Sequence, residues 1–325
     1  IFVSILLALI IFYLSINHII WFDFWHSLSI PAQPPFSDLK AHILFYECFE
    51  IGINIYLDEC MLIPDGNAKI STHPTIWLKI VKFLNLQNVY VYNIFLIFTF
   101  SVYFYCLLKL FSSFDTFKSK IFFIIFFFST SNFILIERFA TDIIIFILVF
   151  AILSTNKKIL QSAFIFFGIL LKYYPIFLTS IFIKNKKMLI LASITYFFFI
   201  IIFYINEIKL VNENILEIAL MIAYGSRTLT KAFYHLSLEY GFFINDNNLN
   251  FFRYITVFVF FVYSILLLIV GYKKDTLHEA KHKRELDKHF LAGASIYVGT
   301  YIIGANADYR LVFLIFTIPY IVNLE

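Results

Sequence analysis

Three apolar stretches of this chain, each of membrane length, carry charged residues near their midpoints and lysines beside them. The interrupting residues are Glu137, Arg138 and Asp142 in the first stretch, Lys172 and Tyr173 in the second, and Asp308 and Arg310 in the third. A charge at the centre of a bilayer costs about 3 kcal/mol on insertion scales, so such residues are candidates for a functional site. Carboxylates mixed with fixed cations suit a reaction that deprotonates one group and expels an anion.

Asp38 is the candidate general base, because it follows the rigid segment Pro34-Pro35-Phe36-Ser37 shortly after the first apolar run. A general base must come within about 2.6–3.2 Å of the proton it removes. Asp is also favoured as a helix N-cap, which is the structural alternative for Asp38 and for Asp142. Glu137 and Arg138 have a structural alternative too, an ion pair that holds two helices together.

The cations are candidates for binding a phosphate. Lys172 follows a long apolar run, so its ammonium would either reach the outer interface along its own stem or pair with a phosphate. Arg138 and Arg310 suit a phosphate better in geometry, because a guanidinium can donate two parallel hydrogen bonds. We expect the charged residues to converge on a cavity that enters the bilayer from the outer face, with Arg227 and His235 above it. Arg227 could also be a solvated loop residue.

The composition indicates a multi-span membrane protein. Apolar residues make up 61% of the 325 residues and mean hydropathy is +0.86, whereas a soluble domain has about 45–50% apolar residues. The net charge of +4 is modest, and no basic–aromatic pattern suggests nucleic acid as a partner. The three cysteines lack metal-ligand spacing and no phosphate-binding glycine loop is present, so we expect neither a metal nor a cofactor.

The apolar runs predict an all-α protein with about ten membrane helices, several of them in short hairpins. The predicted spans are 1–22, 88–111, 121–136, 142–155, 159–171, 174–183, 188–205, 252–271, 289–305 and 311–323. Some are too short for a full crossing, since 159–171 would extend only about 20 Å. Residues 159–183 could instead form one span, but the lysines at its two ends would then lie on opposite sides of the membrane. Hairpins are therefore the preferred arrangement.

Basic residues predict the orientation. They concentrate around Lys118, Lys157 and Lys186 and in the charged loop 272–288, so we expect these segments and the N-terminus in the cytoplasm. The two long segments expected outside are 23–87 and 206–251. We expect one transmembrane domain over 1–325, in a chain that is a fragment at both ends. Its first apolar run lacks a cleavage site and is interpreted as a span.

The first outer loop contains two stretches with amphipathic helical patterns, 38–50 and 74–84, which suit helices lying in the outer interface. Cys48 and Cys60 also lie in this loop and could form a disulfide if the loop is exported. Two unpaired thiols are the alternative that we favour from sequence.

The order of these motifs resembles the membrane glycosyltransferases of the GT-C fold, in particular glycosyltransferase family 87. The loop PPFSDLKAHILFYECFEIGINIYLDEC, followed by HPTIWL, is similar to a family loop in which an Asp follows the first span and a Pro-x-x-Trp helix closes the loop. ERFATDIIIFILVFAIL and GILLKYYPIFL resemble a helix start with an Asp and a Lys-aromatic-Tyr-Pro turn, and NADYRLVFLIFTIPY resembles a late segment of related proteins. His73 and Thr141 depart from the aromatic residue and the Asn that the family often has there.

The resemblance implies transfer of a hexose, mannose-like by default, from a polyprenyl-phosphate donor to a lipid or glycan acceptor. The reaction would invert the anomeric centre on the outer face of a membrane, expected to be a bacterial plasma membrane. Asp38 would remove the acceptor proton. The leaving phosphate would be bound by Lys172, Arg138, Arg310 and Arg227. The residues expected to position the substrate are Glu137, Asp142, Asp308, Tyr173 and His235.

Two other functions fit the same pattern. A polymerase or ligase acting on lipid-linked oligosaccharide would depend on outer-loop arginines such as Arg227. A transporter or flippase would use the charges as a relay, but transporters usually show inverted repeats with matching broken helices, and the two halves of this chain do not match.

Overall fold

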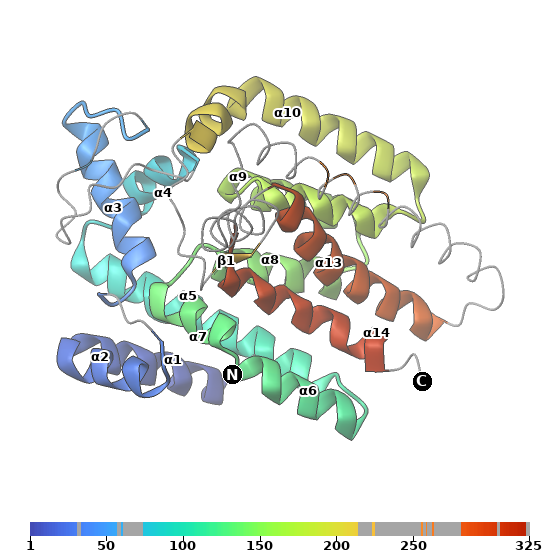
Figure 1. The fold of residues 1–325 in the computed structure, drawn as a ribbon, viewed down its shortest axis with the longest axis horizontal. Coiled ribbons are helices and arrows are strands. Elements are labelled where there is room, and N and C mark those ends of the chain that lie inside the picture. Colours follow the sequence, from blue (N-terminus) through green and yellow to red (C-terminus); the bar gives the residue numbers. More distant parts are fainter. Residues whose placement is uncertain are drawn as a thin grey trace, which may run out of the picture. The chain divides into compact units, whose positions relative to one another are not determined.

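The structure is a computed structural model (Figure 1) that describes residues 1–30, 34–56, 60, 74–213, 223–224, 255, 258, 262, 281–303 and 306–322. The chain divides into two compact units, Ile1–Leu216 and Glu217–Glu325. The secondary-structure elements of the described residues are helices apart from two strands of two residues each, as the composition predicts. A single domain over the whole chain stays a prediction.

The N-terminal apolar run, predicted as a span over 1–22, forms a bent pair of helices that together are apolar and long enough for one span. α1 (Phe2–Ile16) and α2 (His18–Ser27) meet at Asn17 at an angle of 115°. The side-chain oxygen of Asn17 accepts hydrogen bonds from two backbone N–H groups of α2, at 3.0 and 3.3 Å. Asn17 is therefore the N-cap of a new helix and ends α1 inside a sequence that is apolar on both sides.

One described helix is by itself long and apolar enough to cross a membrane. It is α5 (Val89–Ser112), which has 24 residues, matches the predicted span 88–111 and packs along α1. α6 (Phe117–Phe127) and α7 (Thr130–Arg138) form a second bent pair, at 48°. If each bent pair counts as one span, the described residues contain up to three, which is fewer than the apolar runs predict.

Shorter apolar helices follow in the first unit. α8 (Asp142–Ser154) packs on α9 (Lys158–Leu171), and the 3-10 helix η1 (Tyr174–Phe182) packs on α9 in turn. α10 (Lys186–Glu213) contacts both η1 and α9. α10 extends beyond the predicted span 188–205 at both ends.

The chain breaks at Lys172, as the hairpin interpretation predicts. Lys172 has extended backbone angles, with φ −153° and ψ 149°, and ends α9. Gly168 lies against η1, where an added Cβ would come within 3.0 Å of the Cβ of Pro175. Glycine therefore permits the close approach of η1 to α9, and the alternative of one continuous helix over 159–183 is not observed.

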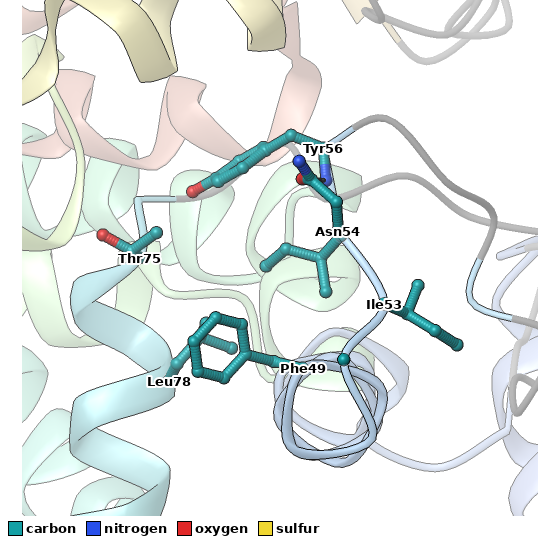
Figure 2. A pocket seen from close by; sticks show the side chains of 8 residues that line it. Phe49, Ile53, Asn54, Tyr56, Thr75 and Leu78 are labelled. Carbon is teal, nitrogen blue, oxygen red and sulfur yellow. Dashed lines mark hydrogen bonds between the residues drawn. The ribbon is translucent and has the colours of Figure 1, made fainter.

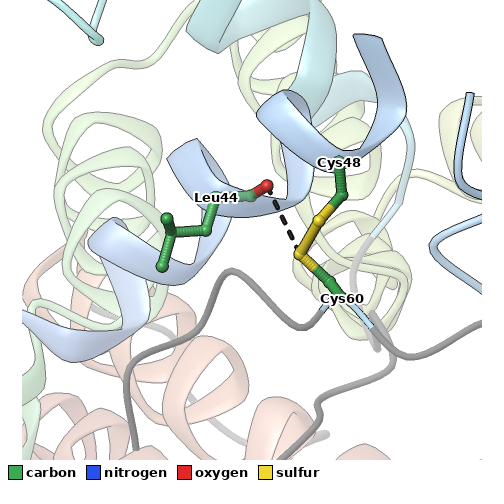
Figure 3. The surroundings of a disulfide bond; sticks show 3 residues. All are labelled: Leu44, Cys48 and Cys60. Carbon is green, nitrogen blue, oxygen red and sulfur yellow. Dashed lines mark hydrogen bonds between the residues drawn. A yellow bond between two sulfur atoms is a disulfide. The ribbon is translucent and has the colours of Figure 1, made fainter. Parts of the chain in front are cut away.

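Both stretches predicted to be amphipathic form helices that pack against each other, α3 (Ser37–Glu50) and α4 (Ile76–Leu84). Cys48 near the end of α3 forms a disulfide with Cys60, with the two Cα atoms 5.9 Å apart (Figure 3). The sulfur of Cys60 also lies 3.5 Å from the carbonyl oxygen of Leu44. The favoured expectation of two free thiols is therefore wrong. The pairing depends on how the loop folds, which cysteine spacing alone does not determine.

The second unit contains a short ladder and a helical pair. β1 (Ala223–Tyr224) pairs antiparallel with β2 (Asn306–Ala307). α13 (Lys281–Ile303) packs on the 3-10 helix η3 (Asp308–Thr317) and on α14 (Ile318–Val322). α13 starts inside the charged segment that was expected to be a loop up to residue 288. Most of the predicted span 252–271 lies outside the described residues.

Candidate functional site

The candidate site is centred on the turn between α7 and α8, where a break was predicted. Phe139 occupies this turn with a φ of 50°, a conformation that costs a non-glycine residue about 1–3 kcal/mol. Its buried ring packs edge-on against Phe100 at 5.1 Å and Phe36 at 6.3 Å. This aromatic packing holds the turn, so Arg138 at the end of α7 and Asp142 at the start of α8 are presented close together.

Asp142 is the centre of a buried hydrogen-bonded group. Lys172 Nζ donates to Asp142 Oδ2 at 2.5 Å, and the hydroxyl of Tyr174 donates to Asp142 Oδ1 at 2.5 Å. Asp142 is 0% exposed and Lys172 6%. Each carboxylate oxygen therefore has a donor, and the start of α8 is joined to the turn between α9 and η1.

Glu137 and Arg138 are neighbours on α7 and form an ion pair without a hydrogen bond between the two atoms. Arg138 Nε lies 3.7 Å from Glu137 Oε2, beyond hydrogen-bonding distance, and Glu137 is fully buried. Because both residues lie on α7, this contact does not join two helices, as the predicted alternative would require. Within the described part of the chain the buried Nε of Arg138 has no hydrogen-bond acceptor. Such a donor suits an anionic ligand.

α3 is anchored to the same turn at two points. The backbone N–H of Phe36 donates to the carbonyl oxygen of Glu137 at 3.1 Å. Six residues further along the chain, His42 Nε2 lies 3.3 Å from Thr141 Oγ1. Asp38 is half-buried between these anchors, in the first turn of the helix.

The alternative role of Asp38 as a helix N-cap is not realised. The N-cap position of α3 is Phe36, which has left-handed backbone angles. Asp38 stands two residues further on, where a carboxylate is favoured by the positive end of the helix dipole.

His42 is buried at the junction of three elements. Its ring stacks on Trp77 of α4, with centroids 4.3 Å apart and planes inclined by 2°. It is 3% exposed. Burial, and secondly the positive charge of Lys172, lower the pKa of His42 to about 3. The imidazole is therefore neutral at physiological pH and links α3 to Thr141 and α4 without adding a charge.

The sequence interpretation missed His42 and Tyr174. The amphipathic pattern predicted over 38–50 did not single out His42, yet the buried face of α3 includes it, three residues after the buried Leu39. That spacing was the available signal. Tyr174 was not among the predicted site residues, but it is buried and its hydroxyl donates to Asp142. Its position two residues after a lysine inside an apolar run could have indicated a partner in the interior.

Three of the remaining predicted residues lie in the described part of the chain, namely Tyr173, Asp308 and Arg310. Tyr173 is half-buried beside Lys172. Asp308 begins η3 of the second unit, and Arg310 follows it with a half-buried side chain. Arg227 and His235 lie outside the described residues.

A cavity of about 300 Å³ lies at the other end of α3, beside the start of α4 (Figure 2). Its lining residues are Phe49, Gly52, Ile53, Asn54, Ile55, Tyr56, Thr75 and Leu78. At 1.5 Å per residue, Phe49 lies about 16 Å along α3 from Asp38. This cavity is therefore separate from the candidate site.

Among the described residues, no three His, Cys, Asp or Glu side chains lie close enough together to hold a metal ion. Comparisons of the chain with protein-family models, with curated proteins and with solved structures found no match.

Proposed function

We propose that this protein is a multi-pass membrane glycosyltransferase that moves a hexose from a polyprenyl-phosphate donor to a lipid or glycan acceptor. A membrane location is supported by α5 and by the exposed apolar side chains along α1 and α6, including Leu9, Ile10 and Ile125. Apolar surface of this kind is stable in lipid and unfavourable in water.

The observation that carries the proposal is the anchoring of α3 to the turn between α7 and α8. Phe36 and His42 fix the helix start that bears Asp38 against the segment that bears Arg138 and Asp142. Transfer of a sugar from a phosphate can use a carboxylate that accepts the acceptor proton and a guanidinium that binds the leaving phosphate. Asp38 and Arg138 are groups of these two kinds.

In the proposed reaction Asp38 takes the proton from an acceptor hydroxyl. The hydroxyl oxygen attacks the anomeric carbon, and the bond from that carbon to the phosphate oxygen breaks. The donor leaves as the polyprenyl phosphate anion, and inversion follows from direct displacement. Arg138 would stabilise the charge that develops on the phosphate, an electrostatic effect worth about 3–4 kcal/mol for one well-placed donor.

Lys172 and Arg138 differ in the partners that compensate their charges. Its ammonium is already compensated by Asp142, so the pair is neutral as a unit. We propose that Arg138 is the principal phosphate ligand of this turn, and that Lys172 assists through donors not used by Asp142. Arg310 and Arg227 remain predicted ligands, and Asp308, Tyr173 and His235 remain predicted positioning residues.

The disulfide supports the predicted outward orientation of the first loop. Disulfides persist in oxidising compartments and are rare in the cytosol. Since Cys48 lies on α3, the helix of Asp38, a site at the start of α3 would face the outer side, where polyprenyl-linked sugars would be consumed.

The proposal is tested by Asp38→Asn in isolated membranes supplied with a radiolabelled polyprenyl-phosphate hexose. Loss of a general base lowers the rate by about 10²–10⁴-fold, so transfer should fall by that factor while donor binding persists. Asp115→Asn, on an exposed position between α5 and α6, is the matched control. Transfer at the wild-type rate would remove Asp38 from the mechanism. Flux of the lipid-linked sugar across vesicles without bond formation would favour the transporter alternative.

A further inference from the structure

We infer that His42 is a positioning residue for the reaction, holding Asp38 in place through its contact with Thr141. The inference rests on the proposed function, because the proposed reaction requires a general base and His42 is assigned the role of positioning it.

The geometry of α3 carries the inference. Residues four apart lie on the same helical face, so Asp38 and His42 face the turn between α7 and α8 together. His42 Nε2 meets Thr141 Oγ1 at 3.3 Å, and Thr141 directly precedes Asp142. A rotation or shift of α3 that moved Asp38 would therefore also break the contact between His42 and Thr141.

A purely apolar packing role does not explain the choice of histidine. An imidazole that is 3% exposed loses its hydration and requires partners in the protein. Leu or Phe would fill the same space on Trp77 without that cost. The polar contact with Thr141 is what histidine adds, and it fixes the angle of α3 about its axis in a way that apolar packing does not.

Two variants separate the two contacts of His42. His42→Phe retains an aromatic ring on Trp77 and removes the contact with Thr141. His42→Gln places an amide near the position of Nε2 and removes the ring. Thr141→Val removes the same contact from the other side with little change in volume, and Thr141→Ser restores a hydroxyl. His26→Phe, at an exposed position on α2, is the matched control.

Transfer from the radiolabelled donor is measured as kcat and as KM for the donor. A displacement of about 1 Å costs about 10²-fold in rate, so kcat should fall about 10- to 100-fold in His42→Phe and in Thr141→Val. The donor KM should stay within about twofold, because the cations that bind the phosphate are unchanged. The double variant should be no slower than either single variant, since both remove one interaction. His42→Gln and Thr141→Ser should recover most of kcat.

The outcomes distinguish this inference from the function it rests on. If the wild-type protein transfers no hexose from the labelled donor, the proposed function is wrong. Wild-type transfer together with an unchanged kcat in His42→Phe contradicts the positioning role alone. Losses that multiply in the double variant, or a rise in KM at constant kcat, overturn it as well, because they indicate independent packing or binding effects. If His42→Phe does not fold, the pair Thr141→Val and Thr141→Ser gives the same comparison.

Discussion

At the scale of single residues, Asp142 and Lys172 depend on each other for compensation. Both are buried, and Tyr174 supplies the second donor to Asp142. Removing charges from water costs several kcal/mol per ion, and the attraction between them roughly offsets that cost. The pair therefore contributes less to net stability than its short contact suggests, while each partner alone would be strongly unfavourable.

A single replacement in this pair should therefore lower the free energy of unfolding more than the double replacement does. We expect Lys172→Met to lower the free energy of unfolding by about 3–5 kcal/mol, because Asp142 is left buried without its cation. The double variant Asp142→Leu with Lys172→Met should cost less than Lys172→Met alone. Unfolding in mixed micelles measures these differences. A double variant whose loss equals the sum of both single losses would show that the two charges are not coupled.

At the scale of elements, the disulfide ties the end of α3 to the segment that follows it. Cys48 and Cys60 are separated by 12 positions. Closing a loop of about 15 residues stabilises a protein by about 3 kcal/mol in the chain-entropy description. The bond therefore restricts the segment between α3 and Cys60 and helps to keep the buried face of α3 in place.

Thiol labelling in a Cys106→Ser background tests this bond. Without reductant, a maleimide should label neither Cys48 nor Cys60 in the denatured protein, and after reduction it should label both. Replacing Cys48 by Ser should lower the stability of the oxidised protein by about 2–3 kcal/mol, following the loop-closure cost. Two thiols that react before reduction would contradict the pairing and would weaken the outward orientation of α3.

The sequence predicted those elements whose ends carry a strong local signal. Charges inside apolar runs indicated the turn between α7 and α8 and the break at Lys172, since backbone rarely continues as helix through such clusters. The bend at Asn17 was missed, because one capping side chain decides it within an otherwise uniform apolar sequence. The described residues contain fewer candidate spans than predicted, because apolar composition does not indicate how helices are bent or shortened.

The candidate site was predictable in its residue types and only partly in its contacts. Asp142 and Lys172 stood out as charges in apolar sequence, and the structure joins them. Their third member, Tyr174, resembled many other tyrosines of this aromatic chain. His42 was missed because its partner Thr141 lies 99 positions away, so only the fold brings the two together.

At the scale of the whole molecule, the question is which side of the membrane the candidate site faces. The turn between α7 and α8, the break at Lys172 and the start of α3 meet within the first unit. Lys157 lies at the opposite ends of α8 and α9, and Lys118 lies in the first turn of α6, the helix before α7. If the positive-inside rule applies, the candidate site faces outward.

Single cysteines at the two ends of α5 test this orientation. Gln87 and Ser112 are exposed and lie about 36 Å apart along the helix, and Asn156 is exposed in the connection between α8 and α9. In a Cys106→Ser background that retains the disulfide, each position is changed to Cys and intact cells receive a membrane-impermeant maleimide. Gln87→Cys should be labelled at once, whereas Ser112→Cys and Asn156→Cys should be labelled only after permeabilisation. The reverse pattern would place the start of α3 in the cytoplasm and exclude an outward-facing site, and equal labelling of both ends would show that α5 does not cross the membrane.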